Sequence, residues 1–157
     1  MYTPTYFRLE EFFSEDFLFA NPLNENLWRL IDSRLLVTAD RLRKRYGPMI
    51  VNDYKWGGDN QLRGYRSVWD LLDKRHLTQT GDILPIMSTF TSQHCFGRAL
   101  DAKFNQVPVE DVRVDILNDP DCYHFAFITA VEMDVDWLHI DVRNWDKEKN
   151  GILTFKG

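Results

Sequence analysis

Two short segments constrain this chain more than any other feature: residues 92–101 and residues 137–141. They contribute His94, Asp101 and His139, which are two imidazoles and one carboxylate. This donor set is typical of a catalytic zinc site whose fourth position is left to water. The chain must therefore fold so that side chains far apart in sequence converge on one ion.

The spacing between His94 and Asp101 requires a bend. On an extended strand, which rises about 3.3 Å per residue, these residues would lie about 23 Å apart. Bonds between zinc and its ligands are only about 2 Å long. Gly97 is the favourable place for a turn, because glycine adopts backbone angles that other residues resist. We therefore expect His94 on a loop, Asp101 on the following strand and His139 on a neighbouring strand.

The first segment also carries a recognisable signature. Ser92, His94, Gly97, Ala99 and Asp101 match all five defined positions of a motif found in a family of zinc peptidases. The segment resembles that of the D-alanyl-D-alanine carboxypeptidase and L-alanyl-D-glutamate endopeptidase family. The resemblance implies that the first histidine and the aspartate of the motif bind Zn²⁺.

The second segment strengthens the resemblance. Trp137, His139 and Asp141 are similar to the family's second motif, in which the histidine is the third zinc ligand. Residues 56–66 also resemble short phage-encoded members, and the likeness extends over residues 48–145. It implies a phage endolysin-like peptidase that hydrolyses an amide bond in the peptidoglycan stem peptide. Carboxypeptidase, dipeptidase and endopeptidase members share these motifs, so the bond that is cut stays open.

The general base departs from the family pattern. Many members place a glutamate three residues before the last histidine, but here that position is Asp136. If the strands on either side form a hairpin with a symmetric loop, Glu132 lies opposite Trp137 and shares a face with His139, because side chains alternate along a strand. We expect Glu132 to take the proton from the attacking water, with Asp136 as the alternative. The departure favours one rival interpretation, an inactive module that keeps its metal and binds wall peptide or a virion partner.

Other residues near the motifs have expected supporting roles. A cation lowers the barrier to oxyanion formation, and the resemblance implies an arginine upstream of the first motif, for which Arg66 is the candidate and Lys55 the alternative. Asp141 is expected to orient a ligand without touching the metal. Ser92 is expected to support its loop through a local hydrogen bond, and Cys95 to pack.

Composition limits the remaining possibilities. The 157 residues, 44% of them hydrophobic, suit a single domain over residues 1–157. The net charge of −5 argues against nucleic acid as a partner. No segment is apolar and long enough to span a membrane, and the N-terminus lacks the features of a secretory signal peptide. We therefore expect synthesis in the host cytoplasm, and the resemblance implies action on the bacterial cell wall. We expect the protein to be a monomer.

The pattern of residues predicts an α+β fold, with a small, mainly antiparallel sheet that carries a zinc cleft. A long N-terminal helix is predicted from Asn24 or Asn26 to Tyr46, with residues 1–22 as an arm over the core. A second helix is predicted from Val68 to Arg75 with Ser67 as its cap, and a third from Pro108 to about Asn118. The expected strands are 49–52, the segment containing Asp101, 122–132 and 137–143, and the expected irregular segments are 77–93 and a frayed polar tail at 146–157.

Overall fold

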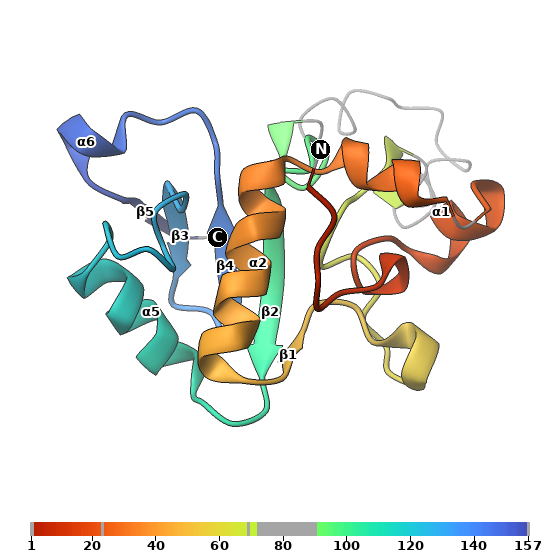
Figure 1. The fold of residues 1–157 in the computed structure, drawn as a ribbon, viewed down its shortest axis with the longest axis horizontal. Helices are drawn as coiled ribbons and strands as arrows, with labels where there is room; N and C mark the ends of the chain where they lie inside the picture. Colours follow the sequence, from red (N-terminus) through yellow and green to blue (C-terminus); the bar gives the residue numbers. More distant parts are fainter. Residues whose placement is uncertain (1, 23, 69, 72–90, 157) are drawn as a thin grey trace.

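The computed structural model of this protein describes residues 2–22, 24–68, 70–71 and 91–156. Five strands form one sheet in the order β1-β2-β4-β3-β5 (Figure 1). All neighbouring strands are antiparallel except β3 and β5, which are parallel. The strands are β1 (Met49–Ile50), β2 (Ala99–Phe104), β3 (Ala130–Met133), β4 (Leu138–Asp141) and β5 (Leu153–Lys156). The predicted α+β class with a mainly antiparallel sheet is confirmed.

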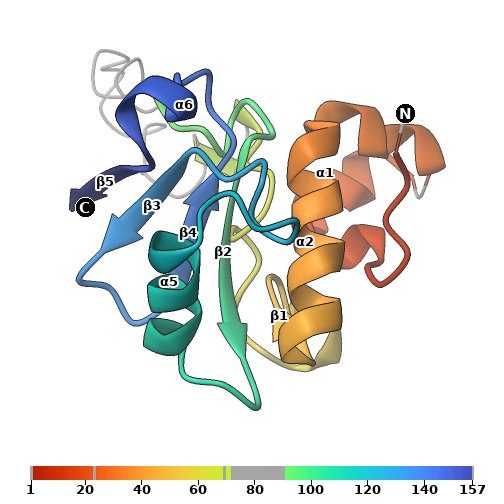
Figure 2. The same cartoon turned by 60° about the vertical axis from the view of Figure 1, so that its left-hand side comes forward.

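Two helices cover one face of the sheet, as Figures 1 and 2 show together. Helix α2 (Ser33–Tyr46) contacts β1 and β2, and helix α5 (Val109–Asn118) contacts β4. Strand alternation sends apolar side chains toward these helices, and the buried core includes Leu100, Leu138 and Ile140. The residues that alternate with these apolar ones point to the opposite face of the sheet. They include Asp101 on β2, next to Leu100, and His139 on β4, between Leu138 and Ile140.

The remaining helices are short. They are α1 (Glu15–Ala20), α6 (Lys147–Asn150) and three 3-10 helices, η1 (Leu9–Glu11), η2 (Glu25–Leu30) and η3 (Tyr54–Trp56). No helix among the described residues has the length and apolar composition that crossing a membrane requires.

The single long N-terminal helix was a wrong prediction. The chain from Asn24 first forms η2, becomes extended at Ile31 and then starts α2, whose N-cap is Asp32. The Asp32 carboxylate accepts a hydrogen bond from the Arg34 amide, and the Asp32 amide donates to the Gly97 carbonyl. Ile31 is buried like a residue on a helical stripe, so periodicity alone could not show that a tertiary hydrogen bond breaks the helix there.

The N-terminal arm packs against the core, as expected. Phe12 and Phe13 are fully buried, and both rings contact Trp28. The arm is also fixed by Asp40 of α2, whose carboxylate accepts hydrogen bonds from the Tyr2 hydroxyl and the Thr5 amide. Burial of aromatic side chains supplies a large share of the stability of a domain this small.

The C-terminal third differs from its prediction in two places. Residues 122–127 form hydrogen-bonded turns instead of a strand, since Phe125 donates to the Cys122 carbonyl and Ile128 to the Phe125 carbonyl. The tail does not fray: β5 pairs with β3 in parallel. Composition did not reveal the turns, because aromatic residues stabilise packed turns as well as strands. It did not reveal β5, because a strand at a sheet edge has only its inner side to bury and can therefore be polar.

Two predictions fall on the gaps in the described residues. Ser67 accepts a hydrogen bond from the Asp70 amide, which fits its predicted place as a helix cap. The rest of the helix predicted after Ser67, and most of the irregular segment 77–93, lie outside the described residues.

Candidate metal centre

The structure brings His94, Asp101 and His139 together. One ligand atom from each residue lies within 4.8 Å of those from the other two, and all three residues are buried. Asp101 of β2 is paired in register with His139 of β4, so the two strands place the carboxylate and the imidazole side by side. The predicted convergence is confirmed as a group that could hold a metal ion.

His94 reaches this group from a turn that closes at Gly97. Gly97 has a φ of +63°, and its amide donates to the His94 carbonyl. A Cβ atom on Gly97 would lie 2.0 Å from the Leu30 carbonyl oxygen. Only glycine therefore fits here, and the bend predicted between His94 and Asp101 is confirmed.

The hydrogen bonds of His94 define its tautomer. Its Nδ1 lies 2.7 Å from the carbonyl oxygen of Gly64, which can only accept, so Nδ1 carries the proton. The free lone pair is then on Nε2, which lies 3.4 Å from Oδ1 of Asp101. Burial lowers the pKa of His94 in spite of the nearby carboxylate. His94 is therefore neutral, as a metal ligand must be.

His139 and Asp101 form the charged part of the group. Nδ1 of His139 lies 2.7 Å from Oδ1 of Asp101. Burial opposes the charge on each, but the hydrogen bond to Asp101 and the nearby carboxylate of Asp141 raise the pKa of His139 to about 9. For Asp101, the hydrogen bond from His139 outweighs burial and holds the pKa of its carboxyl well below the usual range. Without metal, the pair is an imidazolium and a carboxylate.

These contacts test whether a cation fits. Nε2 of His94 and Oδ1 of Asp101 are both electron-pair donors, and they face each other across 3.4 Å. A cation that accepts both lone pairs, and replaces the proton on Nδ1 of His139, would remove this repulsion and complete an N,N,O donor set. The set suits zinc and several other divalent transition metals.

Asp141 lies behind His139. Its side chain is fully buried and is fixed by the Arg143 guanidinium, whose Nε lies 2.9 Å and 2.8 Å from the two carboxylate oxygens. One of these oxygens lies 3.8 Å from Nε2 of His139, a buried atom with no hydrogen-bond partner among the described residues. This is the position from which a carboxylate orients a ligand imidazole, and the role predicted for Asp141 agrees with it.

Glu132 and Asp136, the two candidates for the base, occupy different environments. The pairing of Val131 with Ile140, continued by one residue, puts Glu132 opposite His139 and not opposite Trp137 as a symmetric loop would have it. Glu132 is buried, with a carboxylate oxygen 3.8 Å from Nδ1 of His139. The Asp136 side chain is 72% exposed and pairs with Lys103 at 2.7 Å. Of the two, only Glu132 lies beside the metal group of His94, Asp101 and His139.

Arg66 and Lys55, the two candidates for stabilising the oxyanion, also lie in different environments. Nη2 of Arg66 donates to Oδ2 of Asp101 at 2.9 Å, and its Nε donates to the Leu62 carbonyl at 2.6 Å. Lys55 lies beside Glu10 at 3.9 Å and is largely exposed. Arg66 therefore places its charge next to the ligand carboxylate, whereas Lys55 belongs to the N-terminal part of the molecule.

Sequence reasoning missed two residues at the site. The ring of Phe155, on the strand β5 that was expected to fray, contacts the His139 ring with centroids 5.6 Å apart. Arg113 of α5 is 2% exposed and donates to backbone carbonyls of the β3–β4 hairpin. A signal for Arg113 did exist, because it lies between the buried residues Val112 and Ile116 on a short amphipathic helix.

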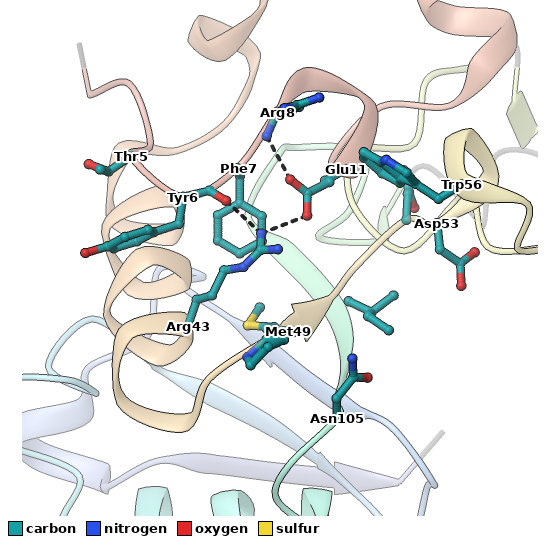
Figure 3. A pocket seen from close by; sticks show the side chains of 13 residues that line it. Thr5, Tyr6, Phe7, Arg8, Glu11, Arg43, Met49, Asp53, Trp56 and Asn105 are labelled. Carbon is teal, nitrogen blue, oxygen red and sulfur yellow. Dashed lines mark hydrogen bonds and ion pairs between the residues drawn. The ribbon is translucent and has the colours of Figure 1, made fainter.

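A pocket in the N-terminal part of the molecule lies apart from the metal group. This N-terminal pocket, of about 530 Å³, lies between residues 5–11, α2, β1 and the turn at 52–56 (Figure 3), and its lining includes none of the three metal-group residues. Figure 3 shows the Arg43 guanidinium between the Tyr6 carbonyl and the Glu11 carboxylate, each 2.7 Å away. The Arg43 and Glu11 charges that line it are thus already paired with each other.

The chemistry of the site has to be argued from its own residues. No protein-family model, curated protein or solved structure matches this chain.

Proposed function

We propose that this protein is a zinc metallopeptidase that hydrolyses an amide bond in the peptidoglycan stem peptide, of the phage endolysin kind. The observation that carries the proposal is the placement of Glu132 opposite His139, beside the group of three metal-binding candidates. Three metal-binding donors and an adjacent carboxylate are the groups that a metal-dependent hydrolase requires. The substrate class rests on the resemblance of the two motifs to the peptidoglycan peptidase family.

The proposed reaction assigns a task to each residue. His94, Asp101 and His139 would hold the zinc, which when bound supplies a water of lowered pKa and polarises the substrate carbonyl. Glu132 accepts the proton of the attacking water and later delivers it to the leaving amine. Burial of Glu132 beside His139 keeps this proton transfer away from bulk solvent.

Arg66 has a separate task. Its Nη2 holds Oδ2 of Asp101, which leaves Oδ1 directed toward both histidines. Its positive charge lies close to the reaction centre, where negative charge develops on the carbonyl oxygen of the substrate. Arginine suits both tasks because its planar fork donates in several directions at once.

The test combines metal content with product analysis. Purified protein is expected to contain about one zinc per chain and to release free amines from purified peptidoglycan, and mass spectrometry of the fragments would identify the bond. Zinc binding without any amine release would overturn the peptidase proposal and leave a metal-containing binding module. Amine release that survives complete removal of metal would overturn the proposed mechanism.

A further inference from the structure

Arg113 makes an unusual set of contacts for a buried cation. It lies on α5 with only 2% of its surface exposed. A buried guanidinium is costly unless its donors are satisfied. On Arg113, Nη1 forms an ion pair with the Glu110 carboxylate, and the other two nitrogens turn inward to the sheet.

The inward nitrogens of Arg113 hold three backbone carbonyls of one hairpin. Nε donates to the Glu132 carbonyl at 3.2 Å. Nη2 donates to the Val135 carbonyl at 3.1 Å and the Trp137 carbonyl at 2.9 Å. The three acceptors lie at the end of β3, within the turn and just before β4, so one side chain connects both arms of the hairpin.

The hairpin needs such a connection because it is irregular at this end. Its turn contains Asp134, a non-glycine residue with a φ of 63°, which is an unfavourable backbone conformation. The pairing between β3 and β4 covers Ala130 and Val131. Glu132 lies just beyond these pairs, where its carbonyl is held by Arg113 and its other side faces Phe155 of β5.

The two functional residues of the hairpin are therefore held differently. His139 is paired with Asp101 across the β2–β4 ladder, on the side away from the hairpin partner. Glu132 has no such link to β2. Its distance from the metal group depends on the geometry of the turn, and Arg113 sets that geometry through the carbonyls of Glu132 and Trp137.

We infer that Arg113 is a positioning residue that fixes Glu132 relative to the metal ligands. The inference rests on the proposed peptidase function. Arg113 touches neither the metal group nor the substrate; it acts through the backbone of the hairpin. A displacement of about 1 Å at a reacting group can cost about a hundredfold in rate.

The test is Arg113→Lys, with Arg41→Lys as the matched control. Lysine keeps the charge but cannot reach three carbonyls from one planar fork. Arg41 also donates to a backbone carbonyl, that of Tyr123 at 2.6 Å, but far from the hairpin. For Arg113→Lys we expect kcat to fall about 10- to 100-fold, with KM unchanged. Zinc affinity should change by less than about tenfold, the smallest loss typical of removing a partner of a metal ligand. Arg41→Lys should leave all three quantities unchanged.

A loss of stability alone would not produce this pattern. If Arg113 only supports the fold, Arg113→Lys lowers the midpoint of thermal unfolding, and kcat per folded, zinc-loaded molecule stays at the wild-type value. That result would overturn the inference. So would a fall in zinc affinity as large as the fall in kcat, because Arg113 would then be holding His139. If Arg113→Lys does not fold, Glu110→Gln removes the outer anchor of the same guanidinium and should lower kcat in the same direction; an unchanged kcat in that variant would overturn the inference.

Amide hydrogen exchange provides a readout that needs no substrate. In zinc-loaded Arg113→Lys, the amides of residues 132–138 should exchange faster than in the wild type, while those of β2 should not. If the hairpin amides exchange at the same rate in Arg113→Lys as in the wild type, the inference is overturned. If the wild-type protein binds zinc but releases no amines from peptidoglycan, the proposed function fails, and the exchange result still decides whether Arg113 fixes Glu132.

Discussion

The metal group and the N-terminal pocket differ in how their polar atoms are satisfied. In the pocket, the Arg43 guanidinium is shared between the Glu11 carboxylate and the Tyr6 carbonyl, so the charges of Arg43 and Glu11 are paired with each other (Figure 3). In the metal group, Nε2 of His94 and Oδ1 of Asp101 face each other as two acceptors. The Arg43 and Glu11 charges in the N-terminal pocket are thus paired, whereas a cation would bridge the two facing acceptors of the metal group.

The comparison shows that volume and chemistry can point to different places. Pockets form wherever packing leaves room, and a pocket whose charges are internally paired is explained by folding alone. A buried group with facing acceptors costs stability unless something binds to it. We therefore assign the chemistry to the metal group, and the following experiments test that assignment from the largest expected effect to the smallest.

Loss of a metal ligand should have the largest effect. His139→Ala removes a nitrogen donor, so zinc affinity should fall by more than the roughly 100-fold that bounds the loss of an outer partner, and peptidoglycan hydrolysis should fall to background. Metal content after dialysis and amine release measure the two effects. Arg43→Lys in the N-terminal pocket is the control and should change neither. Normal zinc content in His139→Ala would remove this residue from the metal group.

Loss of the base should separate binding from chemistry. Glu132→Gln is expected to keep its zinc and to lose about 10²- to 10⁴-fold in kcat, the usual contribution of a general base. Asp136→Asn is the control, because the Asp136 carboxylate is exposed and paired with Lys103. Steady-state kinetics on peptidoglycan fragments would check both. Full activity of Glu132→Gln together with an inactive Asp136→Asn would reverse the assignment.

The protonation of His139 predicts a pH dependence of metal affinity. Below its pKa of about 9, His139 carries a proton that the metal must displace. Apparent zinc affinity should therefore rise about tenfold per pH unit from about 6.5 to 9 and then level off. Competition titrations with a chelator of known affinity would measure this slope. A flat affinity between pH 7 and pH 9 would contradict an imidazolium at this position.

Without metal, the same proton stabilises the folded protein. The pKa of His139 in the folded state, about 9, is above its unfolded value of 6.5. The stabilisation is therefore complete below pH 6.5 and is lost as pH rises through 9, by up to about 3 kcal/mol at 1.4 kcal/mol per pKa unit. Denaturant unfolding in the presence of a chelator would detect it. The loss should be absent in His139→Gln, which cannot titrate.

The smallest functional effect is expected in the N-terminal pocket. Glu11→Gln leaves Arg43 without its carboxylate partner and should lower the free energy of unfolding by about 1 to 3 kcal/mol. Zinc affinity and kcat should stay at wild-type values, because the pocket that Glu11 lines includes none of the metal-group residues. Unfolding curves and kinetics on the same preparation would separate the two quantities. A selective loss of kcat without a loss of stability would make the pocket part of the functional site.

Much of the site could be predicted from particular residues. If His94 and Asp101 share an ion, their spacing demands a turn, and Gly97 was the residue able to make it. That these two residues and His139 form one set was implied by the resemblance of the two motifs to the zinc peptidase family. Strand alternation put Glu132 on the same face as His139, and this parity survived although the hairpin register differs by two residues from a symmetric loop. The choice between Arg66 and Lys55 could not be made in this way, since both precede the motif on loops.

The sequence by itself determined which side chains could form the metal group and which faces of the strands they occupy, because these properties follow from residue type and from the two-residue period of a strand. Tertiary structure alone decided that a hydrogen bond from Asp32 to Gly97 breaks the predicted long helix, that the polar tail becomes the strand β5, and that Arg113 holds the hairpin. Each of these depends on a contact between distant segments. Local preferences do not encode such contacts, because the partner atoms come together only when the chain has folded.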